Sequence, residues 1–437
     1  MKLTFYIFLF SIIFFSCSKS EEAQEIIEQE ETNIDITKPN ILLVIADDMG
    51  LDATPGYDLV NSIKPQMPNL EAMISNGIKF TNTWSYSVCS PTRASILTGK
   101  YGFRTNVLRA GDVLSTSEIS LQKYLDNQNS GYSHKLIGKW HLSSDINHPN
   151  SMGIDDFAGF RNGGVTSYSN WDFIENLQTS NSTEYTTTKF TNLAIDWVAN
   201  QTQPWFLWLA YNAPHTPFHL PPNNLHSQGS LPSESSAIET NPLPYYLAMI
   251  EAMDTEMGRL ISTFSQEVKD NTIIIFIGDN GSPRQVAQVY PNGRAKESLY
   301  QGGINVPMVV SGKNIERIGA IEDALINTTD LYATIAEIAG LNIAEINDSK
   351  SFKSLFKTSN TSIRDYAFSE LEDTSGNIDY TIRNNTFKYM SFSSGQEALY
   401  NLINDPLEST NLLNNTLTDT ENNNKLALIA EVTRLKQ

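Results

Sequence analysis

Cysteine is scarce in this sequence, with only Cys17 and Cys89 among 437 residues. No network of disulfides can therefore form. A single Cys17–Cys89 bridge would require the N-terminal segment to stay attached to the folded chain, which we do not expect. The two cysteines are better explained by separate chemical roles.

Positive charge is also in short supply. Lys and Arg together number 30 against 49 Asp and Glu, so the formal net charge is −19. So acidic a chain argues against a nucleic-acid-binding surface, and no nucleic-acid partner is expected. A polyanionic substrate would have to be held by a local group of cationic side chains.

The apolar run at the N-terminus, residues 3–15, is too short to span a bilayer as a mature helix. Its length suits the hydrophobic region of a signal peptide. The run ends before Ser16 and Cys17, and a small residue in front of a cysteine is similar to a lipoprotein signal, in which the cysteine is acylated. Residues 1–17 are therefore predicted to be a lipoprotein-type signal peptide.

Residues 18–38 contain six Glu, one Asp and no aromatic side chain. Such a composition cannot bury enough apolar surface to offset chain entropy, so this segment is predicted to be a flexible acidic tether. Acidic residues just after a lipidated cysteine resemble the surface-export signal of some Gram-negative bacteria. We therefore expect an exported lipoprotein with an outer-membrane lipid anchor, facing the periplasm or the cell surface.

Two apolar runs, residues 40–46 and 272–278, are typical of strands buried on both faces of a parallel sheet. Each run ends in a pair of oxygen-bearing side chains, at the strand end where ligands bind in open α/β sheets. Either pair alone is better explained as a turn. Together they favour one hard cation such as Ca²⁺ rather than zinc, with these ligands: Asp47, Asp48, Asp279 and Asn280.

Alternating strand and helix patterns predict an α/β fold with a large, mostly parallel central sheet flanked by helices. Past about residue 360 short strand candidates follow one another, which predicts a small antiparallel sheet subdomain over residues 361–437. Residues 39–360 are predicted to form the main domain. Its predicted strands cover residues 40–46, 78–84, 134–137, 205–210, 272–278 and 308–310, and its helices residues 65–76, 92–97, 117–125, 186–199, 243–264 and 330–339.

The segment over residues 87–100 carries a cysteine followed at fixed spacing by a proline and an arginine. Pro91 suits the first turn of a helix, so residue 89 is expected at the amino end of that helix. Free amides and the helix dipole favour an anion there. Arg93, one turn further on, can reach back toward the same anion.

Three more motifs supply cationic and imidazole side chains. Lys139 and His141 form a Gly-Lys-x-His arrangement at the end of a short strand, where alternate residues can face the same side. His215 lies in an Ala-Pro-His-x-Pro turn after a buried strand. Lys296 precedes a Tyr-x-Gly-Gly-x-x-Val-Pro segment. Any one histidine alone would more often be structural, so the set as a whole carries the prediction.

Together these motifs resemble those of the type I, formylglycine-dependent sulfatases of the alkaline-phosphatase-like superfamily, from about residue 40 to the C-terminus. The resemblance implies that fold and the hydrolysis of sulfate esters at the S–O bond. It implies that a separate formylglycine-generating or sulfatase-maturating enzyme oxidises Cys89 to Cα-formylglycine, whose hydrated form is the nucleophile. It also implies a Ca²⁺ ion held by residue 89 with Asp47, Asp48, Asp279 and Asn280.

The same resemblance implies roles for the cationic and imidazole side chains. Arg93 and Lys139 would hold the hydrated aldehyde, and Lys296 would hold the sulfate. His215, with Lys296, would protonate the leaving oxygen. His141 would take the proton from the second hydroxyl so that the aldehyde re-forms. At Gln301 and Asn305 the sequence departs from the Glu and Arg that many relatives carry.

Two other functions remain open: a phosphatase or phosphodiesterase on the same scaffold, and a non-catalytic surface protein that binds glycans. A Cys89 and Arg93 pair favours sulfate, since phosphate-cleaving relatives commonly use Ser or Thr as the nucleophile. The expected substrate is a sulfated carbohydrate of an extracellular polysaccharide, rather than a small aryl sulfate. The stretch from Phe160 to Trp171 and the Pro-rich loop with His219 are candidate sugar contacts, or else ordinary surface loops.

Overall fold

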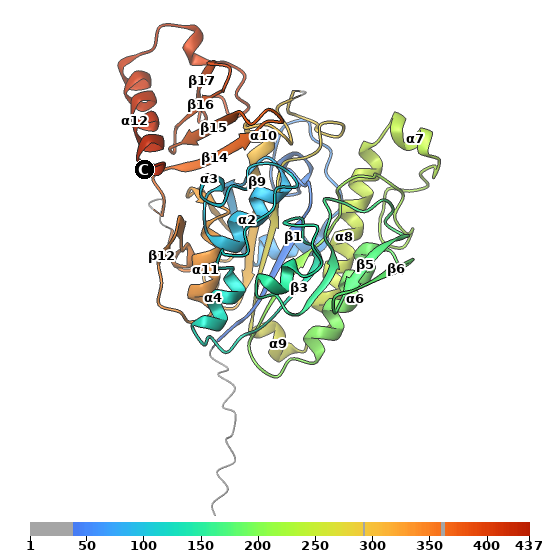
Figure 1. Ribbon diagram of the computed structural model, residues 1–437. Helices are drawn as coiled ribbons and strands as arrows, with labels where there is room; N and C mark the ends of the chain where they lie inside the picture. Colours follow the sequence, from blue (N-terminus) through green and yellow to red (C-terminus); the bar gives the residue numbers. More distant parts are fainter. Residues whose placement is uncertain (1–37, 292, 360–362) are drawn as a thin grey trace, which may run out of the picture. The chain divides into compact units, whose positions relative to one another are not determined.

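An eleven-stranded mixed sheet organises the described residues, 38–291, 293–359 and 363–437, of this computed structural model (Figure 1). The predicted signal peptide and the predicted tether up to residue 37 lie outside these residues. In spatial order the strands are β10 (Ala320–Glu322), β2 (Gly77–Trp84), β9 (Asn305–Gly312), β8 (Thr272–Gly278), β1 (Asn40–Ala46), β7 (Trp205–Ala210), β3 (Ser133–Lys139), β4 (Phe157–Phe160), β5 (Trp171–Glu175) and β6 (Gln178–Ser182), with β11 (Ile326–Asn327) paired to β2.

The central strands β8, β1, β7 and β3 are all parallel. Every residue of β8, β1 and β7 is buried, as their continuous apolar runs predict. Antiparallel pairs appear outside this centre, where β9 pairs with β8 and β2, and where β5 pairs with β4 and β6. The expected α/β class with a mostly parallel sheet is confirmed.

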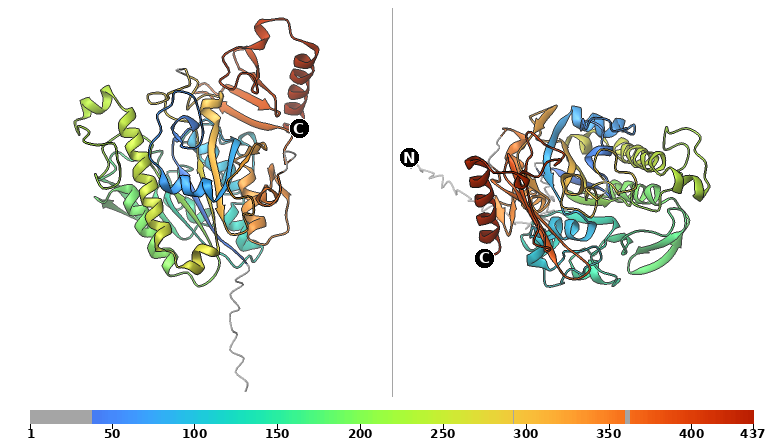
Figure 2. Two further views of the ribbon diagram at one scale, coloured as in Figure 1. Left: turned by 180° about the vertical axis from the view of Figure 1, so that it is seen from behind. Right: turned by 90° about the horizontal axis from the view of Figure 1, so that it is seen from above.

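Helices cover both faces of the sheet because its strands alternate their side chains between two hydrophobic cores (Figure 2). In β1, Ile41, Leu43 and Ile45 enter one core and the intervening residues enter the other. The first core is covered by α2 (Cys89–Thr98), α4 (Leu121–Asn127) and α11 (Asp330–Ile338). The second is covered by α1 (Pro68–Ser75), α6 (Thr186–Ala199) and α8 (Leu243–Thr263).

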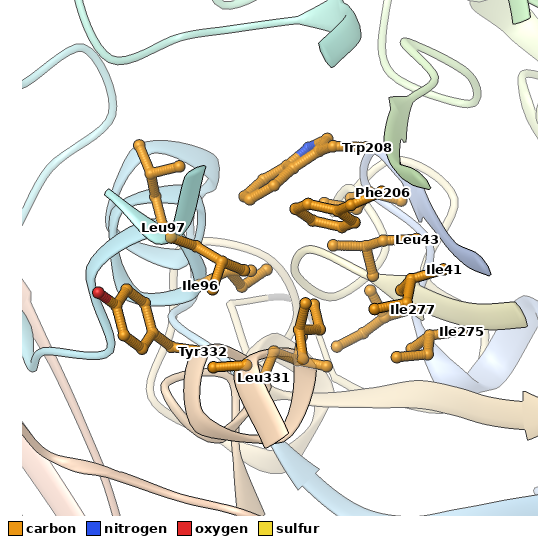
Figure 3. Packing of buried hydrophobic residues seen from close by; sticks show 14 of the residues in the cluster. Ile41, Leu43, Ile96, Leu97, Phe206, Trp208, Ile275, Ile277, Leu331 and Tyr332 are labelled. Atoms are coloured by element: carbon orange, nitrogen blue, oxygen red, sulfur yellow. The ribbon is translucent and has the colours of Figure 1, made fainter. Parts of the chain in front are cut away.

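Figure 3 shows how the first core packs at the centre of the sheet. Side chains of β1, β7 and β8 meet those of α2 and α11. Full burial of each such aliphatic side chain stabilises the fold by about 1.5–3 kcal/mol. This packing holds α2 against the sheet. The labelled residues are Ile41, Leu43, Ile96, Leu97, Phe206, Trp208, Ile275, Ile277, Leu331 and Tyr332.

The C-terminal residues form a four-stranded antiparallel sheet of β14 (Ala367–Glu372), β15 (Ile378–Arg383), β16 (Phe387–Ser391) and β17 (Glu397–Asn401). The last helix, α12 (Asp419–Leu435), packs on it through Leu428 and Val432. The predicted small antiparallel sheet is therefore present. The remaining elements are η1 (Leu51–Ala53), α3 (Gly102–Thr105), α5 (His148–Ser151), α7 (Ser235–Thr240), α9 (Gln266–Asp270), α10 (Gln301–Ile304), β12 (Glu345–Ile346), β13 (Ser349–Lys350), η2 (Lys353–Phe356) and η3 (Leu412–Asn414).

A buried ion pair ties this C-terminal sheet to the segment that carries Lys296. Lys388 of β16 donates to Glu408 at 2.5 Å and to the carbonyl of Leu299 at 2.7 Å. The other carboxylate oxygen of Glu408 accepts the N–H of Gln301 at 2.6 Å. Both charged side chains are fully buried, so neither can exchange its partner for water.

We predict that Lys388→Met lowers the free energy of unfolding by about 3–5 kcal/mol, because it leaves the buried Glu408 carboxylate without its cation. Denaturant unfolding measures the loss. Lys425→Met is the matched control, since Lys425 pairs with Glu397 at 2.6 Å on the surface. That substitution should cost no more than about 1 kcal/mol. Equal losses in the two variants would contradict the role of the buried pair.

Candidate active site

Asp47 and Asp48 lie where the central strand β1 ends. The N–H of Asp47 donates to the carbonyl of Ala213, beyond β7, at 3.1 Å, and the N–H of Asp279, beyond β8, donates to Ala46 at 3.0 Å. The backbone ladder thus continues past three strand ends and brings them to one edge of the sheet. Asp48 has a φ of 71°, and this left-handed residue turns the chain away from the strand.

The pair at the end of β8 contacts the pair at the end of β1. Asp279 accepts the N–H of Asp48 at 3.0 Å, and the amide nitrogen of Asn280 donates to Asp48 Oδ1 at 2.8 Å. Asn280 Oδ1 is buried and has no hydrogen-bond donor among the described residues. A buried acceptor of this kind needs a partner, and a cation is one that suits a carbonyl oxygen.

Cys89 is the first residue of α2, as the position of Pro91 predicted, and its side chain lies at the same strand ends. Its Sγ is 3.4 Å from Asp47 Oδ1, 3.9 Å from Asp48 Oδ1 and 3.2 Å from Lys139 Nζ. Only 2% of the residue is exposed. Cys89 is a free cysteine in this structure.

Three cationic side chains balance the three buried carboxylates. Lys139 donates to Asp47 at 2.6 Å, Lys296 donates to Asp48 at 2.6 Å, and Arg93 donates to Asp279 at 2.8 Å. Arg93 also donates to the carbonyl of Lys139 at 2.9 Å, which links α2 to the end of β3. Each carboxylate therefore has its own hydrogen-bonded cation. The predicted cationic residues are Arg93, Lys139 and Lys296.

The two histidines reach the site from β3 and β7. His215 Nε2 lies 3.7 Å from Asp48, and its Nδ1 donates to the carbonyl of Thr216 at 2.7 Å. His141 has a φ of 57°, so a left-handed turn brings it beside Lys139. The prediction that both side chains face the site as alternate residues of an extended segment is wrong in this detail, because the strand ends at Lys139.

Burial and neighbouring charges set the protonation states. Burial raises the pKa of Asp47, but the charges of Lys139 and Arg93 outweigh it and hold that pKa well below its usual range. Burial and the charge of Asp47 raise the pKa of Asp279 to about 7, against the opposing effect of Arg93. More positive charge at this site would therefore be needed to keep all three carboxylates ionised.

Burial also raises the pKa of the Cys89 thiol well above its usual range. An unmodified Cys89 would stay protonated, and a thiol is a poor nucleophile. Burial, with the charges of Lys139 and Arg93, lowers the pKa of His141 to about 2, which leaves its imidazole neutral. Burial likewise lowers the pKa of His215, while the carboxylate of Asp48 opposes that effect.

These contacts bring together every residue predicted for the site, and they suit a hard cation. Ligand atoms of Asp47, Asp48, Cys89 and His215 lie within 4.8 Å of one another. His215 was expected only beside the leaving group, so its place in this cluster is new. With Asp279 and Asn280, which both contact Asp48, the site offers four oxygen-bearing side chains, the kind of ligand that Ca²⁺ prefers.

Two tyrosines that support the site were not predicted. Tyr246 of α8 lies with its hydroxyl 2.8 Å from the carbonyl of Asp48 and 3.0 Å from Ser282 Oγ. The hydroxyl of Tyr168 lies 2.6 Å from the carbonyl of His215. Tyr246 falls within an ordinary helical pattern, so no signal in the sequence separates it from the core residues around it.

The expectation that Phe160 and Trp171 offer faces to sugars is wrong. Trp171 is 2% exposed and packs against Phe190 with ring centroids 5.3 Å apart, because β4 and β5 join the main sheet. The ring of His219 lies against Tyr168 with centroids 4.1 Å apart and planes inclined at 33°. These rings belong to the packing around the site.

Two sequence-family models match the chain. The model described as Sulfatase matches residues 39–341, and the one described as N-sulphoglucosamine sulphohydrolase, C-terminal, matches residues 294–434. The first match alone covers well over half of the chain. It includes every predicted site residue from Asp47 to Lys296.

Curated relatives are similar over most of the chain. Uncharacterized sulfatase YdeN of Escherichia coli K12 is 27% identical over 365 residues, and human N-acetylgalactosamine-6-sulfatase is 26% identical over 343 residues. The matches cover 70% and 69% of this chain but only 63% and 62% of those two relatives. A sulfatase of Formosa agariphila is 25% identical, with 94% of this chain and 89% of that relative covered.

Solved structures share the fold. Ps i-CgsB in complex with k-i-k-neocarrahexaose has a TM-score of 0.78 at 24% identity, covering 91% of this chain and 92% of that one. BT4656 with D-glucosamine-2-N,6-O-disulfate has a TM-score of 0.74 at 20% identity, covering 91% and 98%. A phosphonate monoester hydrolase of Agrobacterium radiobacter has 0.68 at 19%, covering 91% and 95%, so the fold alone does not distinguish sulfur from phosphorus.

The assignment to a family thus rests on the sequence match over residues 39–341 and on the residues it contains, with Cys89 buried between paired aspartates and three cationic side chains. The alkaline-phosphatase-like fold expected from the motifs is the one that the structural neighbours share. This chain belongs to the sulfatase family.

Proposed function

We propose that this protein hydrolyses sulfate esters, with residue 89 as the nucleophile after its oxidation to Cα-formylglycine. The observation that carries the proposal is the position of the Cys89 side chain. Its Sγ lies 3.4 Å from Asp47 and 3.2 Å from Lys139, at the amino end of a buried helix. A tetrahedral anion placed there would contact the cationic side chains and the helix amides together.

The side chains of Asp47, Asp48, Asp279, Asn280 and residue 89 would hold a calcium ion. The orphaned Oδ1 of Asn280 and the carboxylate oxygens fit such an ion. Bound there, calcium would withdraw charge from the sulfate oxygens. The oxidised residue 89 would supply two hydroxyls in its hydrated form, one to attack sulfur and one to let the aldehyde re-form.

The remaining steps fall to the chain's own side chains. Lys139 and Arg93 fix the position of residue 89, and Lys296, whose side chain is 15% exposed, faces the incoming sulfate. Neutral His141 accepts a proton from residue 89. Neutral His215 must gain a proton before it can protonate the leaving oxygen, and the negative charge of a bound sulfate favours that protonation.

Sulfate is favoured over phosphate by the nucleophile rather than by the fold. The buried Cys89 would remain a protonated thiol without modification, and oxidation resolves that problem. A purely glycan-binding protein has no need for three cations hydrogen-bonded to three buried carboxylates, since buried ion pairs add little to stability.

The proposed substrate is a sulfated carbohydrate from an extracellular polysaccharide. Two structural neighbours were solved with k-i-k-neocarrahexaose and with D-glucosamine-2-N,6-O-disulfate, and their likeness to this chain supports a sugar sulfate here. We further propose export and lipid anchoring at Cys17, on the N-terminal sequence alone. Among the helices of residues 38–437 that are described, none has the length and apolar character needed to cross a bilayer.

We predict that Cys89→Ser lowers turnover of a sulfate ester by on the order of 10⁶-fold, as the loss of a nucleophile does elsewhere. Serine offers one hydroxyl and no second one to release the sulfate. Sulfate release and intact mass are measured on protein made with a maturation enzyme. Cys17→Ser is the control and should keep full activity. A Cys89→Ser variant that completes many turnovers would refute the formylglycine mechanism.

A chelator is predicted to abolish activity, which Ca²⁺ restores and Zn²⁺ does not, because four side chains of the site, Asp47, Asp48, Asp279 and Asn280, offer oxygen donors. Asp279→Asn should weaken Ca²⁺ binding by about 10-fold or more, measured by calorimetry, because it removes a charged ligand and even residues behind the ligands contribute that much. Asp145→Asn, at an exposed carboxylate, is the control and should bind Ca²⁺ normally. Full activity in excess chelator, with no metal found by elemental analysis, would rule out the site.

Against a panel of sulfated oligosaccharides and one chromogenic aryl sulfate, we predict the higher kcat/KM on a sugar. The proposed site holds an acid for the leaving oxygen, His215 or Lys296, and a sugar hydroxyl, which is a poor leaving group, needs that acid, whereas an aryl oxygen does not. Sulfate release is the readout for every substrate. Rapid aryl turnover with no sugar accepted would show that the substrate class is wrong while leaving the sulfatase activity intact.

A further inference from the structure

Residues 161–168 link the backbones beside the two histidines of the site. At one end, the carbonyl of Arg161 accepts the N–H of His141 at 3.0 Å, continuing the pairing of β3 with β4. At the other end, the hydroxyl of Tyr168 lies 2.6 Å from the carbonyl of His215, and this tyrosine is buried. The segment is therefore held at both ends, once next to each imidazole.

Between these anchors, two consecutive glycines lie against the two rings. A Cβ atom at Gly163 would lie 2.8 Å from His141 Nε2 and 2.9 Å from its Cε1. A Cβ atom at Gly164 would lie 3.1 Å from His215 Cε1 and 3.2 Å from its Nδ1. At both glycines these distances are shorter than ordinary van der Waals contact. A Cβ at Gly163 cannot be accommodated unless the ring or the backbone moves.

The backbone itself does not demand glycine at these positions. Neither Gly163 nor Gly164 has a left-handed φ, so an alanine is compatible with the local conformation. What glycine provides is the close approach of the chain to a ring. Only the imidazoles occupy the space that a methyl group would take within 3.4 Å.

Hydrogen bonds alone do little to orient the rings. His141 Nδ1 is buried and has no hydrogen-bond partner among the described residues. His215 is held by one bond from its Nδ1 to the carbonyl of Thr216, while its Nε2 lies 3.7 Å from Asp48. Steric contact with the glycine segment therefore restrains His141 where hydrogen bonds do not, and it adds to the one hydrogen bond that holds His215.

We propose that Gly163 and Gly164 are positioning residues, each fixing the ring plane of one histidine: Gly163 for His141 and Gly164 for His215. The catalytic meaning of this inference rests on the proposed function, because both imidazoles are assigned proton transfers there. A ring rotated by a bulkier neighbour would hold its nitrogen out of reach of the proton it must accept or give.

The direct test is NMR of the full chain labelled with ¹³C at histidine Cε1, with signals assigned through His141→Gln and His215→Gln. Gly163→Ala should shift the His141 signal and leave that of His215 in place, and Gly164→Ala should do the reverse. Asn162→Ala is the matched control on the same segment, because its side chain is exposed, and it should shift neither signal. Unshifted rings in both glycine variants would overturn the inference.

Kinetics on a sulfated sugar give the second readout. Gly163→Ala should lower kcat at least tenfold while KM changes less than threefold, since the sulfate is held by other side chains. Asn162→Ala should match the unchanged protein. Normal kcat in both glycine variants would overturn the positioning role. If the unchanged protein releases no sulfate, the proposed function fails, and the NMR result still decides the steric contact.

Thermal unfolding keeps the inference testable if Gly163→Ala folds poorly. The Tm lost in that variant should return when His141→Ala is added, because the shortened side chain no longer meets the new methyl group. In the Asn162→Ala control, adding His141→Ala should bring no gain in Tm. A Tm that stays low in the Gly163→Ala and His141→Ala double variant would show that the methyl group clashes with something else.

Discussion

Three carboxylates buried at the ends of two neighbouring strands are the constraint on which the site depends. Removing such charges from water is costly unless each is paired, and here Lys139, Lys296 and Arg93 each bond one of them. These six formal charges sum to zero, three positive and three negative. A divalent cation would therefore make the site net positive within a chain of net charge −19, which is the local attraction that a sulfate needs.

The buried strands could be predicted because their sequences are apolar without interruption. The runs over 40–46, 205–210 and 272–278 match β1, β7 and β8 residue for residue. The hairpin of β5 and β6 was missed, since all five residues of β6 are polar and its burial pattern shows no apolar face. The start of helix α12 at Asp419 carries a signal in the sequence, because Thr418 and Glu421 form a capping box there.

The site residues could be named because they lie in motifs that resemble those of the sulfatases, and most of these motifs stand near the end of a strand or in the first turn of a helix. What the sequence could not provide is how distant segments meet. Tyr246 comes from the middle of α8 to contact Asp48, and the left-handed turn at His141 replaces the extended geometry that was expected. Gly163 and Gly164 stood within a stretch expected to contact sugars, and only their distance to two rings, from other parts of the chain, separates them from ordinary loop glycines.

The burial of Cys89 constrains when the proposed oxidation could take place. All ten residues of α2 are buried, and the helix is packed between the main sheet and α11. Under the proposed function, a separate enzyme has to reach Cys89, and the folded protein leaves only 2% of that residue exposed within a fully buried helix. The proposed oxidation would therefore have to precede the docking of α2, and a chain that folded first would keep an inactive thiol.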